Sequence, residues 1–327
     1  MGQQLNWAII GAGSIAGEMA QAFKAMGRTP FGVAGRTREK AEMFAQRYSI
    51  ATLYENPQQA FADPAVDVVY LATPHNTHAA LIEQALTAGK HVLCEKAITL
   101  NSEELERCMG LATEKRLVLA EAMTIWHMPL YHELWRRLLT GEWGPVQLLQ
   151  LNFGSFKPYD MTSRFFNLDL AGGALLDIGV YALSCARSFL SSAPDQLLSR
   201  VKLAPTGTDE QAVILLQNPQ GQMATVTMSL HSKLPKRAVI GCERAYIEID
   251  DYPRAAVARV VDAATGAVTE IRAGETARAL EYEVQAMEQA VKSGDQSTMH
   301  LVWTRDVMTL MTNLRREWGV CYPGEER

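Results

Sequence analysis

The stretch "LNWAIIGAGSIA", residues 5–16, decides the fold class of this chain. It begins as a β-rich apolar run, continues as Gly11-x-Gly13-x-x-Ala16, and leads into helical spacing over residues 14–26. Gly11 permits a tight turn, Gly13 lets a pyrophosphate approach the backbone, and Ala16 allows close helix packing. The helix N-terminus, at Ser14 and Ile15, adds amide donors and a positive dipole. At the first strand-to-helix junction the pattern predicts a dinucleotide site, the alternative being a small-residue turn of another α/β protein.

The rest of the first third alternates apolar strands with helical patterns. Strands are expected at residues 31–35, 66–73, 91–96 and 116–122, and helices at 38–48, from Thr77 to Gly89, and from an Asn101 cap. This alternation builds a parallel, doubly wound sheet. The sequence therefore predicts an α/β protein whose N-terminal Rossmann domain covers residues 1–123.

After about residue 124 the pattern changes to short strands separated by turn signals. We expect strands at 146–154, 211–218, 221–230, 236–242 and 244–250, a hairpin turn at "NPQG" (218–221), and closing helices around 280–291 and 307–318. This pattern predicts a C-terminal α+β domain over residues 124–327, with a large, mainly antiparallel sheet. The closing helices are expected to pack back toward the Rossmann domain.

Composition and charge exclude several classes of protein. The 327 residues carry a formal net charge of -5, which argues against a nucleic-acid partner. No stretch approaches the ~18 to 20 consecutive apolar residues of a membrane span, so we expect no membrane partner. The start, residues 1–13, lacks the basic region of a secretory signal. Five scattered cysteines without CxxC spacing indicate reduced thiols and a cytoplasmic location.

Ligands of an open parallel sheet bind beyond the carboxyl ends of its strands, so the residues after each strand matter most. After the second strand comes "GRTREK" (35–40), with Arg36, Thr37 and Arg38 where NAD sites usually have a carboxylate. Two guanidinium groups fit a 2′-phosphate, which favours NADP over NAD. The alternative is an exposed first turn of a helix.

Two further strand ends carry polar residues. "TPHNTH" (73–78) supplies Thr73, Pro74 and His75 for contact with cofactor or substrate. His78 is a weaker candidate than His75, because a packing histidine is a strong alternative for it. No carboxylate or cysteine joins the two histidines, so we expect no metal. "VLCEKAIT" (92–99) turns polar at Glu95 and Lys96, where the nicotinamide of a Rossmann site would lie.

A second group of polar residues lies in "AGGALLDIGVYAL" (171–183). Asp177 and Tyr181 are four apart and share one face of an otherwise apolar helix. A nearby lysine ammonium favours the phenolate of a tyrosine, which would make Tyr181 a usable acid and base. The alternative is a polar pair satisfied at a domain interface.

Taken in order, "GAGSIA", "TPHNTH", "CEKA" and "GGALLDIGVY" resemble the glucose–fructose oxidoreductase/inositol dehydrogenase family, Gfo/Idh/MocA. The resemblance runs through nearly the whole chain, to "WGVCYP" (318–323), and is strongest to the dimeric dihydrodiol dehydrogenase and NADP-dependent xylose dehydrogenase branch. It implies that Tyr181 is the acid/base, that Lys96 and Asp177 support it, and that the large sheet forms a homodimer or higher homo-oligomer. Ala97 departs from the proline usual in the family.

The resemblance also implies a substrate. Trp126 occupies a position that lines the substrate pocket in the family, and Lys157 and Arg164, in a polar and aromatic loop, are candidates for binding sugar hydroxyls or else loop surface. We therefore expect an NAD(P)-dependent oxidoreductase, with NADP favoured, acting on a secondary alcohol or hemiacetal carbon of a sugar, polyol or cyclic diol. The alternatives are an NAD-dependent glycosidase of the same fold and a non-catalytic NADP-binding sensor.

Overall fold

The computed structural model describes residues 4–325, so residues 1–3 of the start considered above lie outside the described part. The contacts divide the chain into two units, Met1–Ala122 with Leu280–Leu301, and Met123–Ala279 with Val302–Arg327. The predicted second domain, residues 124–327, differs from the second unit mainly because Leu280–Leu301 groups with the first.

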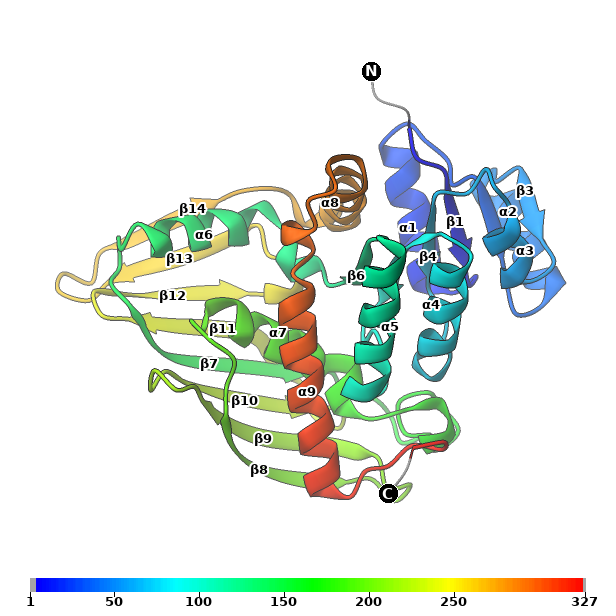
Figure 1. Ribbon diagram of the computed structural model, residues 1–327. Coiled ribbons are helices and arrows are strands. Elements are labelled where there is room, and N and C mark those ends of the chain that lie inside the picture. The colour runs from blue at the N-terminus through cyan, green and yellow to red at the C-terminus, as the bar shows by residue number, and fades with distance from the viewer. Residues whose placement is uncertain (1–3, 326–327) are drawn as a thin grey trace. The chain divides into compact units, whose positions relative to one another are not determined.

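The first unit is built on a six-stranded parallel sheet in the order β3-β2-β1-β4-β5-β6 (Figure 1). This order reverses between β1 and β4, which makes their carboxyl ends the topological switch point where ligands bind in such sheets. The expected doubly wound parallel sheet is confirmed. Its strands are β1 Trp7–Ile10, β2 Gly32–Ala34, β3 Thr52–Tyr54, β4 Val68–Leu71, β5 His91–Glu95 and β6 Leu119–Ala122.

Six helices accompany this sheet in the described part of the chain. Asn101 caps α5 as expected, since its side chain accepts from the Glu104 amide at 2.9 Å. Helix α8 joins the unit through Glu288, whose carboxylate accepts from the Trp7 indole at 3.0 Å and pairs with Arg28 at 2.7 Å. The helices are α1 Ser14–Ala25, α2 Arg38–Tyr48, α3 Pro57–Ala62, α4 His78–Thr87, α5 Ser102–Lys115 and α8 Ala279–Ser293.

The second unit contains an eight-stranded sheet in the order β14-β13-β12-β11-β7-β10-β9-β8 (Figure 1). It is antiparallel except where β7 and β10 run parallel, so the expectation of a large, mainly antiparallel sheet is confirmed. "NPQG" forms the predicted hairpin turn between β9 and β10. The strands are β7 Val146–Gly154, β8 Gln196–Leu203, β9 Asp209–Gln217, β10 Met223–Ser229, β11 Leu234–Cys242, β12 Ala245–Asp250, β13 Val257–Asp262 and β14 Val268–Arg272.

One face of this sheet is covered by helices. Helix α7, Val180–Phe189, packs on β7 and β10, and α9, Leu301–Trp318, reaches β8 through the Trp318 indole, which donates to Ser199 at 2.8 Å. Helix α6 spans Pro129–Leu139. Side chains alternate along the strands as a half-covered sheet requires, with Leu149 and Leu151 of β7 buried and Leu148 exposed.

One stretch has the length and mean hydropathy of a membrane span, although Asp169, Asp177 and Arg187 interrupt its apolar residues. Leu168–Phe189 reaches a mean hydropathy of 1.4 over eighteen residues, yet 72% of that window is buried inside the fold. This burial is typical of the core helix of a globular domain.

Candidate active site

The loop after β1 lies at the switch point and requires glycine. Gly11 has φ +117, and a Cβ there would lie 2.4 Å from the carbonyl oxygen of Ala72, directly after β4. The Gly11 amide donates to the carbonyl of Ala34 at 2.8 Å, so the loop is held between β2 and β4. Any side chain at position 11 would push these strand ends apart.

The next glycine leaves room for a ligand. A Cβ at Gly13 would meet nothing within 4 Å, and Gly13 and Ser14 are exposed at the start of α1. Ala16, by contrast, is fully buried, as its packing role requires, and Ile15 is partly exposed. A hollow of about 1080 Å³, including its open space, adjoins this loop, and Lys40 and Arg47 of α2 also line it. These features fit a pyrophosphate at the N-terminus of α1.

The two arginines after β2 differ in their surroundings. Arg38 Nε donates to Glu42 at 2.8 Å, and the Arg38 guanidinium lies 3.6 Å from Glu55. Hydrogen bonding to Glu42 raises the pKa of Arg38. Arg36 is exposed and has no carboxylate within 4.0 Å among the residues that the structure describes. Thr37 is the N-cap residue of α2 without a side-chain cap bond. Arg36 is therefore the better placed of the two for an anionic group.

The histidines after β4 bind the backbone that follows β5. A ring nitrogen of His75 lies 3.1 Å from the carbonyl oxygen of Lys96. His78 is fully buried, with Nδ1 3.0 Å from the carbonyl oxygen of Ala97 and Nε2 2.8 Å from that of Thr73. Burial lowers the pKa of His78, which favours the neutral ring, so only one of its nitrogens donates at a time. Pro74 is exposed beside them.

Tyr70 contacts the first residue of the polar pair Glu95 and Lys96 at the end of β5. The Tyr70 hydroxyl donates to a Glu95 oxygen, and burial raises the pKa of Tyr70 well above its ordinary value. Lys96 is half-buried, and the Lys96–Ala97 peptide bond is cis. From the neighbouring strand β6, the buried Glu121 accepts from the Ile98 amide at 3.1 Å. Lys96 therefore stands on a backbone fixed at several points.

Asp177 and Tyr181 are the two partly exposed residues of an otherwise buried helix. Asp177 belongs to a π-helical turn, Leu175–Gly179, which runs directly into α7 with Tyr181 in its first turn. All the remaining residues from 174 to 183 are buried. The Tyr181 ring lies 6.0 Å from that of Phe153 on β7. π-Helical turns inside helices are frequent at functional sites. Lys96 belongs to the first unit, whereas Asp177 and Tyr181 belong to the second.

The loop before this helix contacts Asp177 directly. Arg164 Nη1 lies 3.3 Å from Asp177 Oδ1, and the side chains are 60% and 13% exposed. Arg164 and Lys157 both lie over the ring of Phe165, at 4.3 and 4.6 Å. The third predicted substrate residue, Trp126, is fully buried and packs edge-on against Trp303 of α9. Its role in substrate binding stays a prediction.

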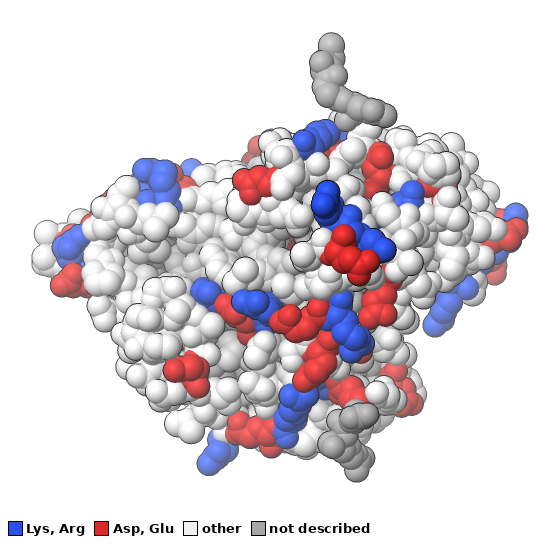
Figure 2. All heavy atoms as spheres, in the orientation of Figure 1, with Lys and Arg blue, Asp and Glu red and all other residues white. Residues whose placement is uncertain are grey.

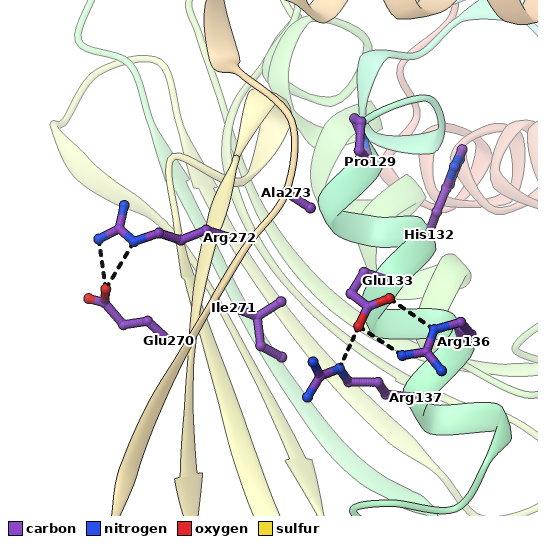
Figure 3. Close-up of a pocket in the computed structure, with 9 residues that line it drawn as sticks. All are labelled: Pro129, His132, Glu133, Arg136, Arg137, Glu270, Ile271, Arg272 and Ala273. Atoms are coloured by element: carbon purple, nitrogen blue, oxygen red, sulfur yellow. Dashed lines mark hydrogen bonds and ion pairs between the residues drawn. The ribbon is translucent and has the colours of Figure 1, made fainter.

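Other surface features lie away from these residues. Another hollow, of about 950 Å³ with its open space included, lies between α6 and β14. Figure 3 shows the residues that line it, among them Glu133, which pairs with Arg136 and Arg137. None of the predicted site residues lines it. On the face drawn in Figure 2, charges of both signs are interspersed. Within residues 4–325, no three His, Cys, Asp or Glu side chains are grouped to hold a metal ion.

Two domain models of one protein family match the sequence, one after the other along the chain. Residues 5–123 match the oxidoreductase family with an NAD-binding Rossmann fold, and residues 131–248 match the GFO/IDH/MocA C-terminal domain. The chain belongs to the GFO/IDH/MocA oxidoreductase family. The resemblance drawn from the motifs is thereby confirmed, as is the expectation of an NAD(P)-dependent oxidoreductase.

Characterised relatives and solved structures of the GFO/IDH/MocA family extend the comparison. The trans-1,2-dihydrobenzene-1,2-diol dehydrogenase of Mus musculus is 30% identical, covering 75% of this chain and 74% of its own; that of Xenopus laevis is 27% identical over 97% and 99%. KijD10, a 3-ketoreductase from Actinomadura kijaniata solved with NADP and TDP-benzene, has a TM-score of 0.85 at 23% identity, covering 96% and 98%. A levoglucosan dehydrogenase solved with NADH and levoglucosan has a TM-score of 0.84 at 18% identity, covering 95% and 98%.

Proposed function

We propose that this member of the GFO/IDH/MocA family moves a hydride between the nicotinamide of NADP and a secondary alcohol or hemiacetal carbon of a sugar, polyol or cyclic diol. The proposal rests mainly on the partial exposure of Asp177 and Tyr181, since the other residues of their helix are buried. The dihydrodiol dehydrogenase relatives support the substrate class.

The chemistry assigns a role to each catalytic side chain. When bound, the nicotinamide accepts the hydride that leaves the carbinol carbon, or returns it in the reverse direction. Tyr181 takes the proton that the substrate hydroxyl loses, so the carbinol becomes a carbonyl with atoms and charge balanced. Lys96 stabilises the negative charge on oxygen, and Asp177, itself held by Arg164, orients the hydroxyl.

The cofactor's adenosine end is proposed to lie against the start of α2. The exposed Arg36, without a carboxylate partner among residues 4–325, would bind a 2′-phosphate, and Lys40 lines the hollow beside Gly13. Arg38 contributes less, because Glu42 and Glu55 already neutralise it. Thr73, Pro74, His75 and Glu95 complete the proposed cofactor contacts, whereas the buried His78, whose ring nitrogens lie at the carbonyl groups of Ala97 and Thr73, supports the loop. The cationic side chains of Arg36 and Lys40 favour NADP over NAD.

The exposed face of the eight-stranded sheet is proposed to form a homodimer. Large apolar side chains of neighbouring strands stand on that face in register, with Leu148 beside Met223 and Leu215 beside Leu198. Exposed apolar patches of this kind mark protein interfaces. We also propose a cytoplasmic location, which the five free cysteines support.

An absorbance assay of nicotinamide reduction tests the proposed reaction. NADP⁺ and NAD⁺ would each be offered with a panel of aldoses, inositols, polyols and trans-dihydrodiols. Turnover with one class, faster with NADP⁺, is the expected result. Silence across the whole panel, with cofactor bound to the protein, would contradict the proposal.

A further inference from the structure

Two buried side chains from distant parts of the chain form hydrogen bonds with the backbone of the turn that leads into the helix of Asp177 and Tyr181. We propose that Asp209 and Tyr322 form a clamp on the turn Gly172–Leu175 and thereby position Asp177 and Tyr181 for catalysis. The proposal rests on the proposed function for its catalytic part only, because the clamp itself is a matter of contacts within the second unit.

Asp209 holds the amide side of the turn. It begins β9, is fully buried, and its Oδ2 accepts from the Leu175 amide at 2.6 Å, two residues before Asp177. The helix thus gains a capping carboxylate 34 residues away in sequence. Gly173 is shaped to receive it, since a Cβ there would lie 2.1 Å from Asp209 Oδ1.

Tyr322 holds the carbonyl side of the same turn. Its ring is buried, and its hydroxyl donates to the carbonyl oxygen of Gly172 at 2.8 Å, across 150 residues. Arg315 of α9 lies 4.4 Å above the Tyr322 ring and pairs with Glu325 at 2.7 Å. These contacts give the "WGVCYP" segment a function, because it carries Tyr322 to the catalytic helix.

The charges around Asp209 suit a rigid cap. The charged or titratable side chains that interact with it are Arg315 of α9 and Tyr322 in the segment after α9, and Glu325 acts in turn on these two. Burial raises the pKa of Asp209 to about 7, while the Leu175 amide and the Arg315 charge favour its ionised form.

Variants at Asp209 separate positioning from simple stability. Asp209→Ala removes the acceptor and Asp209→Asn keeps a neutral one, while Asp195→Asn makes the same chemical change at an exposed site next to β8. We expect kcat to fall roughly 10- to 100-fold in Asp209→Ala and less in Asp209→Asn. NADP binding and kcat of Asp195→Asn should match the wild type.

Hydrogen exchange of the amides of residues 174–181 provides a readout that needs no turnover. Exchange there should speed up at least tenfold in Asp209→Ala, less in Asp209→Asn, and stay unchanged in Asp195→Asn. Unchanged exchange in Asp209→Ala would overturn the clamp. So would a loss of kcat fully accounted for by a smaller fraction of protein that binds NADP.

Tyr322→Phe keeps the test decisive if the Asp209 variants do not fold. It removes one hydroxyl, so we expect a several-fold loss of kcat and faster exchange in the same segment. Wild-type values of both quantities would overturn the clamp. If the wild type itself turns over no substrate, the proposed function fails, while the exchange measurements still decide whether the clamp exists.

Discussion

Replacing Arg36 by alanine should weaken NADP far more than NAD. Arg36 is exposed and its guanidinium has no carboxylate within 4.0 Å in the described part of the chain, so nothing competes with a 2′-phosphate for it. A hydrogen bond to a charged group contributes about 1.5–3 kcal/mol, and solvent exposure favours the lower end. About 1.4 kcal/mol corresponds to tenfold in binding.

We therefore expect Arg36→Ala to raise KM for NADP about tenfold and KM for NAD less than about twofold. Added salt should shrink the difference, because an exposed ion pair is screened. The assay is nicotinamide absorbance with each cofactor at saturating substrate. Arg107→Ala is the matched control, since Arg107 is an exposed arginine of α5 in the same unit. Equal effects of Arg36→Ala on the two cofactors would refute the reasoning.

Three other predictions address Lys96, the proposed dimer and the buried carboxyl of Asp209. Lys96→Ala should lower kcat roughly 10²-fold in steady-state assays while the Kd for NADP stays within a few-fold, and unchanged turnover would remove Lys96 from the mechanism. The double variant Leu148→Glu, Leu215→Glu should convert the proposed dimer into a monomer in analytical ultracentrifugation, whereas a wild type that sediments as a monomer would disprove the interface. Because the pKa of Asp209 is raised to about 7, the folded chain keeps a proton that the unfolded chain loses above about pH 4. Its contribution to the free energy of unfolding is therefore present at acid pH and is lost as the pH rises toward about 7. Over this range the Tm of the wild type should fall relative to that of Asp209→Asn. A Tm difference that does not change with pH would contradict this prediction.

The Rossmann unit could be predicted because its signals are local. The glycine pattern fixes one strand-to-helix junction, and apolar strands of a parallel sheet place their carboxyl ends at one edge. His75 and Lys96, 21 residues apart, could therefore be expected at the same edge, where the structure places the His75 ring against the Lys96 carbonyl. No knowledge of tertiary contacts was needed for this inference.

The environment of the candidate site could be predicted less well. The pairing of Arg38 with Glu42 was open to prediction, since residues four apart on a helix are neighbours, and it weakens Arg38 as a phosphate ligand. The contact between Arg164 and Asp177 crosses a loop without periodicity. The Asp209 and Tyr322 contacts join segments 34 and 150 residues apart, and such pairs leave no trace in local spacing. The π-helical turn at Asp177 likewise has no sequence signature.

The most direct test of hydride transfer with Tyr181 as acid and base is kcat of Tyr181→Phe in the nicotinamide absorbance assay. Tyr246→Phe, on the exposed side of β12, is the matched control. If Tyr181 exchanges the proton, Tyr181→Phe lowers kcat by roughly 10²-fold or more, with the Kd for NADP unchanged and Tyr246→Phe as active as the wild type. Near wild-type turnover of Tyr181→Phe would contradict this role.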